Sequence, residues 1–191
     1  MGSTLEALAS TGSLYLAINT GLASATEVTH MGGDITEAQV LEAQQAWGDA
    51  LVAISNTYEE EGIDAARALA EEIIAGAYGH DMGPVLFKPT LAEAPQTFRT
   101  TPEGALAYFV GHSDEYSADS GFALKGWQEV TIDNAAIFIS GDMALTMGHV
   151  SILDADGNTT VVDKSWGYHL DDDGDLRIVL HHSSLPYTGE E

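Results

Sequence analysis

The chain has 191 residues, of which 45% are hydrophobic, and this is enough for one domain with a substantial core. The 30 acidic residues outnumber the six basic ones and give a net charge of −24, and a surface of this sign repels nucleic acid and anionic membranes. No run reaches the roughly 18 apolar residues of a membrane span, and the absence of cysteine excludes disulfides and thiolate metal sites. We therefore expect a cytoplasmic protein with no nucleic-acid or membrane partner. A periplasmic or organellar location, after removal of a targeting segment, is the alternative.

The first 33 residues differ in composition from the rest of the chain. They are rich in Gly, Ser, Thr and Ala and contain no Lys or Arg. A secretory signal would begin with positive charges, and this segment has none. We expect residues 1–33 to form a flexible or loosely docked N-terminal arm, residues 34–187 to form the folded domain, and residues 188–191 to form a short tail.

Three helices are predicted in the first half of the domain. The first begins after Asp34 or Thr36, either of which is a good N-cap. Apolar residues recur along it at steps of seven, four, three and four, as on one face of a helix: Val40, Trp47, Leu51, Ile54 and Tyr58. A second helix is expected over about 64–78. The third begins with Pro102 at its first position and Thr101 as its N-cap.

From about residue 124 the hydrophobic period changes from helical to two-fold. Asp-Gly and Gly-Asp steps between the apolar runs indicate tight hairpins. We expect four antiparallel strands, near 125–139, 142–153, 159–169 and 175–184, and a short strand within 83–90. Helices followed by such a meander indicate an α+β fold, in which a curved antiparallel sheet packs against three helices. The mouth of such a cone suits a small ligand.

The last predicted strand passes directly from apolar residues to four polar ones. Because side chains alternate along a strand, one face should carry Arg177, Val179, His181 and Ser183. The other face should carry Ile178, Leu180, His182 and Ser184. An imidazole and a hydroxyl would then lie side by side at the end of a core strand. A frayed, solvated strand end would contain the same residues, so this segment alone leaves both interpretations open.

The histidines and acidic turns do not match common metal motifs. There is no His-Glu-x-x-His or His-x-His spacing, and the acidic turns that start at Asp154 and Asp171 lack the glycine that an EF-hand loop needs at its sixth position. His149 and His169 lie on neighbouring predicted strands, so a site formed in space stays open. Serine-hydrolase elbows and glycine-rich phosphate loops are absent from the sequence.

Several segments resemble the iota-class carbonic anhydrases, which belong to the NTF2-like (SnoaL-like) superfamily. The resemblance covers about residues 34–187, and its terminal His-His-Ser-Ser-x-Pro motif is fairly specific. The segments that carry it are Val40–Gly48, Met82–Thr90, Phe98–Thr101, Ala105–Phe109, Gly126–Trp127 and His181–Pro186.

This resemblance implies a homodimeric cone that reversibly hydrates CO₂ to bicarbonate in a small polar pocket. It places the catalytic groups at Thr90, Tyr108, Ser183 and His181, and substrate contacts at Lys88, Phe87 and Ser184. Some members of the family work without metal, so we expect no cofactor, with Zn or Mn as the alternative. The hydroxyls would hold water or an oxyanion, and His181, with an ordinary pKa of about 6.5, would carry the proton near neutrality.

Two other classes of function stay open. An NTF2-like isomerase or hydrolase of a larger apolar substrate would need an inward-facing Asp, whereas Asp133, Asp142 and Asp163 are expected at turns or on polar faces. A non-catalytic module that dimerises or binds a small ligand would explain the fold without using the polar cluster.

Overall fold

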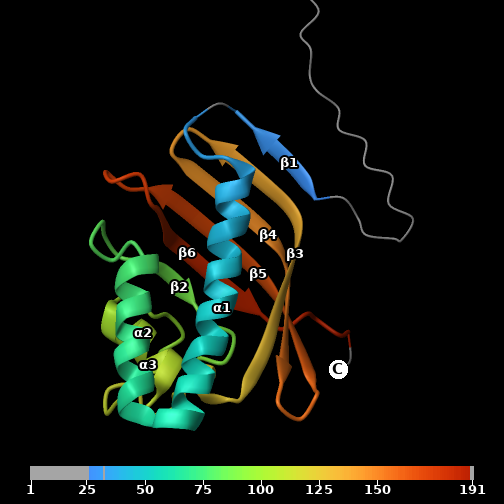
Figure 1. Cartoon of the computed structure of the whole chain (residues 1–191). Helices are drawn as coiled ribbons and strands as arrows, with labels where there is room; N and C mark the ends of the chain where they lie inside the picture. Colours follow the sequence, from blue (N-terminus) through green and yellow to red (C-terminus); the bar gives the residue numbers. More distant parts are fainter. Residues whose placement is uncertain (1–25, 32, 190–191) are drawn as a thin grey trace, which may run out of the picture.

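The computed structural model describes residues 26–31 and 33–189, in which one sheet is covered on one face by three helices (Figure 1). The helices are α1 (Glu37–Glu61), α2 (Ile63–Ala77) and α3 (Pro102–Val110), with a short 3₁₀ turn at Phe122–Leu124. The strands are β1 (Glu27–His30), β2 (Leu86–Lys88), β3 (Trp127–Ser140), β4 (Met143–Asp154), β5 (Thr159–Leu170) and β6 (Leu176–Ser184).

The sheet has the strand order β1-β3-β4-β5-β6-β2. Its four central strands form the predicted antiparallel meander. Both edge strands, however, run parallel to their neighbours, β1 to β3 and β2 to β6, so the sheet is mixed and the expectation of a purely antiparallel sheet is corrected. Strand β1 lies within the segment predicted to be an arm, and residues 1–25 lie outside the described part of the chain.

The helix starts follow the local sequence as expected. Thr36 caps α1 in a complete capping box with Gln39. The Gln39 amide donates to the Thr36 hydroxyl oxygen, and the Thr36 amide donates to the Gln39 side-chain oxygen. Thr101 caps α3 by accepting a hydrogen bond from the Gly104 amide, with Pro102 at the first helical position. The predicted α+β class with three helices is therefore confirmed.

A β-bulge in β6 changes which of its residues face the helices. Gly167 on β5 pairs with Leu180, but the next residue, Tyr168, pairs with Ile178, so Val179 has no partner in this register. Ile178 is consequently buried on the same side as His181. The expectation that Arg177 and Val179 share a face with His181 and Ser183 is wrong, because strict alternation ends at the bulge. The Arg177 guanidinium instead donates to the carbonyls of Ala75 and Tyr78.

A buried ion pair fixes the segment that leads from β2 to α3. The Arg99 guanidinium lies 2.9 Å from the Asp119 carboxylate, and both side chains are almost fully buried. The guanidinium also lies over the Tyr116 ring, 4.5 Å from its centre. The Arg99 amide bonds to the Phe87 carbonyl of β2, so this ion pair holds the β2 end of the site in place.

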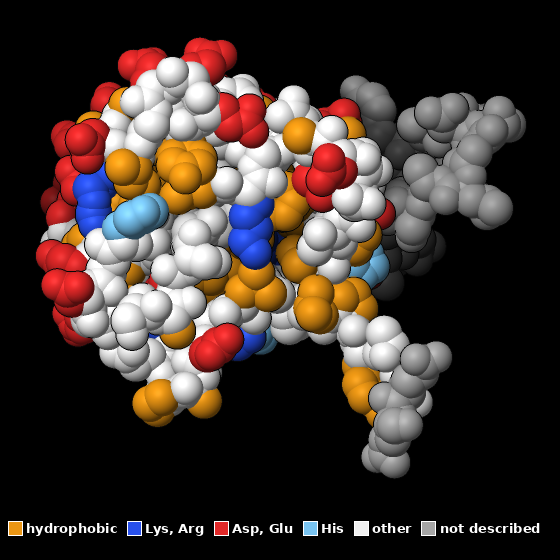
Figure 2. Space-filling model, turned by 90° about the horizontal axis from the view of Figure 1, so that it is seen from below, with side chains coloured by type: hydrophobic (Ala, Val, Ile, Leu, Met, Phe, Trp, Pro, Cys, Tyr) orange, Lys and Arg blue, Asp and Glu red, His pale blue; other side chains and the backbone are white. Residues whose placement is uncertain are grey.

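The acidic character of the chain is visible on its surface. In the face drawn in Figure 2, acidic side chains are spread along much of the outline and few basic ones accompany them. No helix among the described residues is long and apolar enough to cross a membrane.

Candidate functional site

The hydroxyls of Thr90 and Ser183 form the centre of the site. Thr90 Oγ1 donates to Ser183 Oγ across 2.7 Å, although the two residues are far apart in sequence. They meet because β2 pairs with the end of β6, Lys88 opposite His182, and Thr90 follows β2 by two residues. The Lys88 ammonium donates to the Ser183 carbonyl at 3.2 Å, which ties the end of β6 to β2.

Tyr108 brings a third hydroxyl to the same place from α3. Its side chain is buried, and its phenol lies near the backbone amides of Leu91 and Thr90. Burial is the largest influence on this phenol and raises its pKa, although the two amides act in the opposite direction. Tyr108 is therefore a neutral hydroxyl at physiological pH, able to donate one hydrogen bond. We call Thr90, Tyr108 and Ser183 the hydroxyl site.

His181 lies beside the hydroxyl site, but both of its ring nitrogens are engaged. Nδ1 is 2.8 Å from the Tyr78 hydroxyl, and Nε2 is 2.7 Å from the Lys164 ammonium nitrogen. Burial, followed by the charges of Lys164 and His182, lowers the pKa of His181 well below its ordinary value. The expectation that this imidazole titrates near neutrality is thus corrected: it is a neutral, buried ring held between two partners.

Lys164 is a site residue that the sequence reasoning missed. It is the cross-strand partner of Ser183, and both side chains are buried on the helix side of the sheet. Burial lowers the pKa of Lys164 from 10.5 to about 7. The sequence did contain a sign of its burial. Side chains alternate along a strand, so Lys164 shares the inward face of β5 with Val162 and Trp166.

The three predicted substrate-contact residues occupy different places. Phe87 is buried and stacks on the His181 ring, with centroids 4.4 Å apart, so it forms an apolar wall next to the hydroxyl site. Lys88 reaches the Ser183 backbone, as described above. Ser184 pairs with Asp163 on the outer face of the sheet, opposite to Ser183, so the structure does not bring it to the site. This expectation is corrected by the alternation of side chains along β6.

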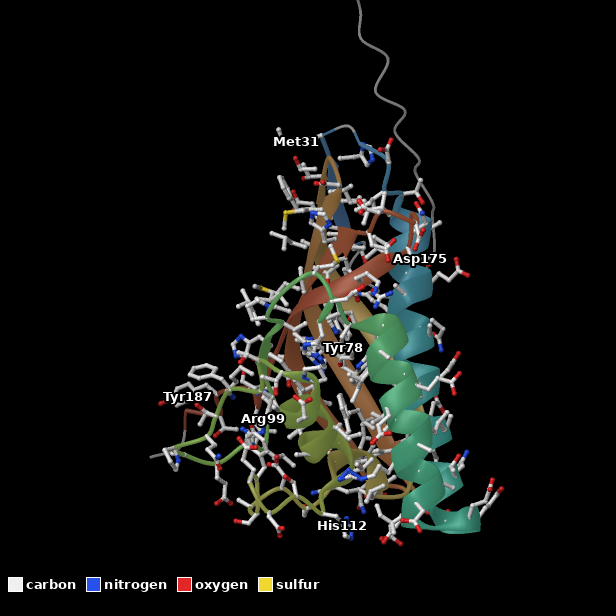
Figure 3. The ribbon with its side chains drawn as sticks, turned by 90° about the vertical axis from the view of Figure 1, so that its left-hand side faces the viewer. Met31, Tyr78, Arg99, His112, Asp175 and Tyr187 are labelled. Atoms are coloured by element: carbon white, nitrogen blue, oxygen red, sulfur yellow. The ribbon has the colours of Figure 1, made fainter. Side chains whose placement is uncertain are left out.

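Figure 3 shows how the elements converge on this region, with Tyr78 in the middle of the molecule between the helices and the sheet. Tyr78 ends α2 and is fully buried, and burial raises the pKa of its phenol. The Trp47 indole, from α1, donates to the same Tyr78 oxygen at 3.1 Å. The site therefore draws residues from α1, the end of α2, α3, β2, β5 and β6.

No group of three or more metal-binding side chains occurs among residues 26–31 and 33–189. His149 faces Asp163 in the middle of the β4–β5 ladder, whereas His169 lies at one end of it beside Asp142, so these two histidines do not meet. A hollow of about 490 Å³ lies elsewhere, between α2 and the start of α3, beside His80 and Glu103.

Comparison with known proteins agrees with this geometry. Residues 38–185 match the family of metal-independent carbonic anhydrases. A metal-independent carbonic anhydrase from Nostoc sp. (strain PCC 7120 / SAG 25.82 / UTEX 2576) is 61% identical over 153 residues, which are 80% of this chain and 75% of the relative. A crystal structure of a cyanobacterial iota-carbonic anhydrase complexed with bicarbonate has a TM-score of 0.81 and 58% identity, and the match covers 85% of this chain and 99% of that one.

A more distant solved structure shares the fold alone. A protein from Xanthomonas campestris, named for the calcium/calmodulin-dependent protein kinase II association domain, has a TM-score of 0.53 and 16% identity over 86% of this chain and 98% of that chain. The fold is thus common to proteins with different names, and the residues of the site carry the functional argument.

Proposed function

The chain belongs to the metal-independent carbonic anhydrase family, and from this premise we propose that it hydrates CO₂ reversibly to bicarbonate at the hydroxyl site of Thr90, Tyr108 and Ser183. Family membership confirms the expectation of a carbonic anhydrase. The observation that carries the location of the reaction is the 2.7 Å bond between Thr90 and Ser183, with the Tyr108 hydroxyl held against the Thr90 backbone.

The chemistry asked of this site is orientation and charge stabilisation. Water is a weak nucleophile and CO₂ a weak electrophile, so a site without metal must hold the two in line and stabilise the bicarbonate charge as it forms. Hydroxyl groups suit both tasks, because each donates one hydrogen bond and also accepts. Phe87 and the neighbouring aromatic rings keep the surroundings apolar, which strengthens these bonds.

The reaction proceeds without a metal cofactor, as the family description states, and the expectation of a metal-free enzyme is confirmed over zinc or manganese. The Asp-dependent isomerase or hydrolase is not supported. Asp133, Asp142 and Asp163 are all exposed, and the inner face of the sheet carries Lys164 and His181 instead.

A homodimer formed through the open face of the sheet is part of this proposal. That face carries large apolar side chains that are 40–63% exposed in a single chain: Phe138, Leu145, Met147 and Val161. Phe138 lies opposite Leu145 across β3 and β4, and Met147 follows two residues along β4, so these three form one apolar patch. Patches of this kind mark interfaces. A cytoplasmic location also stays a proposal.

A stopped-flow assay of CO₂ hydration on the purified protein tests the proposed function. Hydration above the uncatalysed rate, unchanged after dialysis against EDTA and dipicolinate, is the expected result. Metal analysis of the same sample shows whether residual zinc or manganese could account for the rate. A protein without activity before dialysis would contradict the proposal, and activity lost on chelation and restored by zinc would contradict the metal-free mechanism.

A further inference from the structure

The Lys164 amine sits in a cage of aromatic and polar side chains. Its Nζ lies 2.7 Å from His181 Nε2, 4.3 Å from the centre of the Trp47 ring and 5.2 Å from that of Trp166. Trp47 in turn donates to the Tyr78 hydroxyl, which bonds to His181 Nδ1. Four residues therefore form a ring of contacts that fixes where the amine points.

The cage provides no permanent counter-charge for an ammonium group. Among the described residues, every ion pair of the structure involves other side chains, and none places a carboxylate at Lys164. The groups that face Lys164 are His181 from β6, Tyr78 after α2 and the Trp47 ring from α1, all of them neutral. A buried charge without a partner is costly, so this lysine favours the neutral amine whenever no anion is near.

The hydrogen bond to His181 accommodates both protonation states of the amine. When Lys164 is neutral, His181 Nε2–H donates to the amine and the Tyr78 hydroxyl donates to Nδ1. When Lys164 is charged, Nζ donates to Nε2 and Nδ1–H donates to the Tyr78 oxygen. The two distances are satisfied in either arrangement, because the imidazole has two tautomers.

The Lys164 side chain begins beside the hydroxyl site, where the reaction releases a proton. Lys164 and Ser183 are opposite each other across the β5–β6 ladder and point to the same side, and opposite residues in such a ladder have Cβ atoms about 5 Å apart. The burial that keeps this amine neutral lowers its pKa to about 7, which is the range in which a base both takes and returns a proton.

We propose that Lys164 is the proton acceptor of the hydration reaction, held in position by His181. This inference rests on the proposed function. The water oxygen forms a bond to the carbon of CO₂, one C=O bond becomes a single bond to oxygen, and the proton of the water passes to the amine. CO₂, water and a neutral amine thus become bicarbonate and an ammonium ion, and the reverse reaction returns the proton.

The charge balance gives this assignment its physical basis. The site has no net charge when CO₂ and the neutral amine are present, and it has none when bicarbonate and the ammonium are present. The reaction therefore creates an ion pair in a buried place, where opposite charges attract far more strongly than in water, instead of a lone anion. His181 acts as a positioning residue, because it orients the amine and has no nitrogen left for substrate.

Two substitutions test whether Lys164 acts as a base or only supplies a fixed positive charge. Lys164→Met keeps the length of the side chain and removes the amine, and it should lower kcat/KM for CO₂ hydration by about 10²-fold or more. Lys164→Arg keeps a positive charge that is not released near neutrality, so it should bind bicarbonate yet lose hydration to a similar extent. Lys125→Met, the same change at an exposed lysine, is the control and should leave the rate unchanged. Hydration by Lys164→Met within threefold of the unaltered protein would overturn the proposal, and so would full activity of Lys164→Arg.

A measurement that needs no turnover tests the same point on the unaltered protein. NMR titration of ¹³Cε-labelled lysines, assigned with Lys164→Met, reports the protonation of Lys164 with and without bicarbonate. Because bicarbonate favours the ammonium, it should shift this titration upward by about one pH unit or more, whereas an equal ionic strength of chloride should not. An unshifted titration in protein that binds bicarbonate would overturn the assignment. If the unaltered protein hydrates no CO₂ at all, the proposed function itself fails, and that outcome is distinct from an active Lys164→Met variant.

Discussion

The Thr90 hydroxyl donates to the Ser183 hydroxyl at 2.7 Å, and this bond joins the end of β2 to the end of β6. The pair lies on the buried side of the sheet, with Lys88 anchoring the backbone of the same strand end. The pair joins the edge strand β2 to its neighbour β6, so a local change at either residue should alter the site with little effect on the remainder of the sheet.

Removal of either hydroxyl of this pair should impair catalysis more than folding. Thr90→Val and Ser183→Ala each delete one oriented hydroxyl, and we expect kcat/KM to fall by about 10²-fold. Unfolding by urea should show a loss of only about 1 kcal/mol, because one hydrogen bond is lost and little volume is removed. Ser184→Ala is the matched control, since its side chain lies on the opposite face of β6. A larger loss of activity from Ser184→Ala than from Ser183→Ala would show that the site is on the outer face.

The Tyr108 hydroxyl should act as a neutral donor throughout the working pH range. Tyr108→Phe should reduce kcat/KM by about 10²-fold, because the ring remains and the donor is lost. Since burial raises the pKa of Tyr108, the activity of the unaltered protein should show no decline from ionisation of this phenol up to about pH 9.5. Tyr187→Phe, which alters an exposed tyrosine, serves as the control. An undiminished rate in Tyr108→Phe would remove this residue from the site.

Stability should rise with pH because two buried bases are neutral in the folded protein. The pKa of Lys164 is 10.5 when exposed and about 7 when folded, so between these values only the unfolded chain holds the proton. The pKa of His181 is lowered well below 6.5, so below pH 6.5 the unfolded chain again binds more protons. The free energy of unfolding should therefore increase from pH 7 to 9.5 and decrease below pH 6.5, by at most about 1.4 kcal/mol per pH unit for each group.

Urea denaturation between pH 5 and 9.5 measures this dependence. Lys164→Met should remove the rise in the free energy of unfolding above pH 7 and keep the decrease below pH 6.5, because His181 is then the only one of the two buried bases that remains. The range stops at pH 9.5 because three buried tyrosines, Tyr78, Tyr108 and Tyr168, have raised pKa values in the folded protein. Above this pH their phenols ionise first in the unfolded chain, which lowers the free energy of unfolding. A curve for the unaltered protein that does not rise between pH 7 and 9.5 would show that Lys164 keeps its charge in the folded state.

The open face of the sheet should be the dimer interface. Light scattering should give twice the 20.2 kDa of one chain, and Met147→Asp should reduce the mass to that of a monomer, because it places a charge within the apolar patch. Ala68→Asp adds the same charge to the exposed side of α2 and should leave the dimer intact. A Met147→Asp protein that stays dimeric would place the interface on another surface.

The sequence by itself determined the three helices, the four-stranded meander and much of the hydroxyl site, but not strand β1. Local chemistry sufficed for the helix starts at Thr36 and Thr101, for the hairpins of the meander, and for the alternation that separates Ser183 from Ser184. Thr90, Tyr108 and Ser183 were assigned through their resemblance to a family, and in the structure the Thr90 and Ser183 hydroxyls are hydrogen-bonded and Tyr108 lies near the Thr90 backbone. These features depend on residues close in sequence or on motifs that persist within a family, so a sequence is enough to find them.

Only the tertiary structure decided which groups lie around His181. The bulge opposite Tyr168 sets the phase of β6, and the parallel pairing of β2 with β6 places Thr90 at the end of β6. Both are long-range pairings that local patterns do not specify. The bonds from His181 to Tyr78 and Lys164 join residues on three separate elements. Their burial makes the imidazole neutral and the lysine a weaker base, because the surroundings that folding creates shift each pKa from the value of the isolated residue.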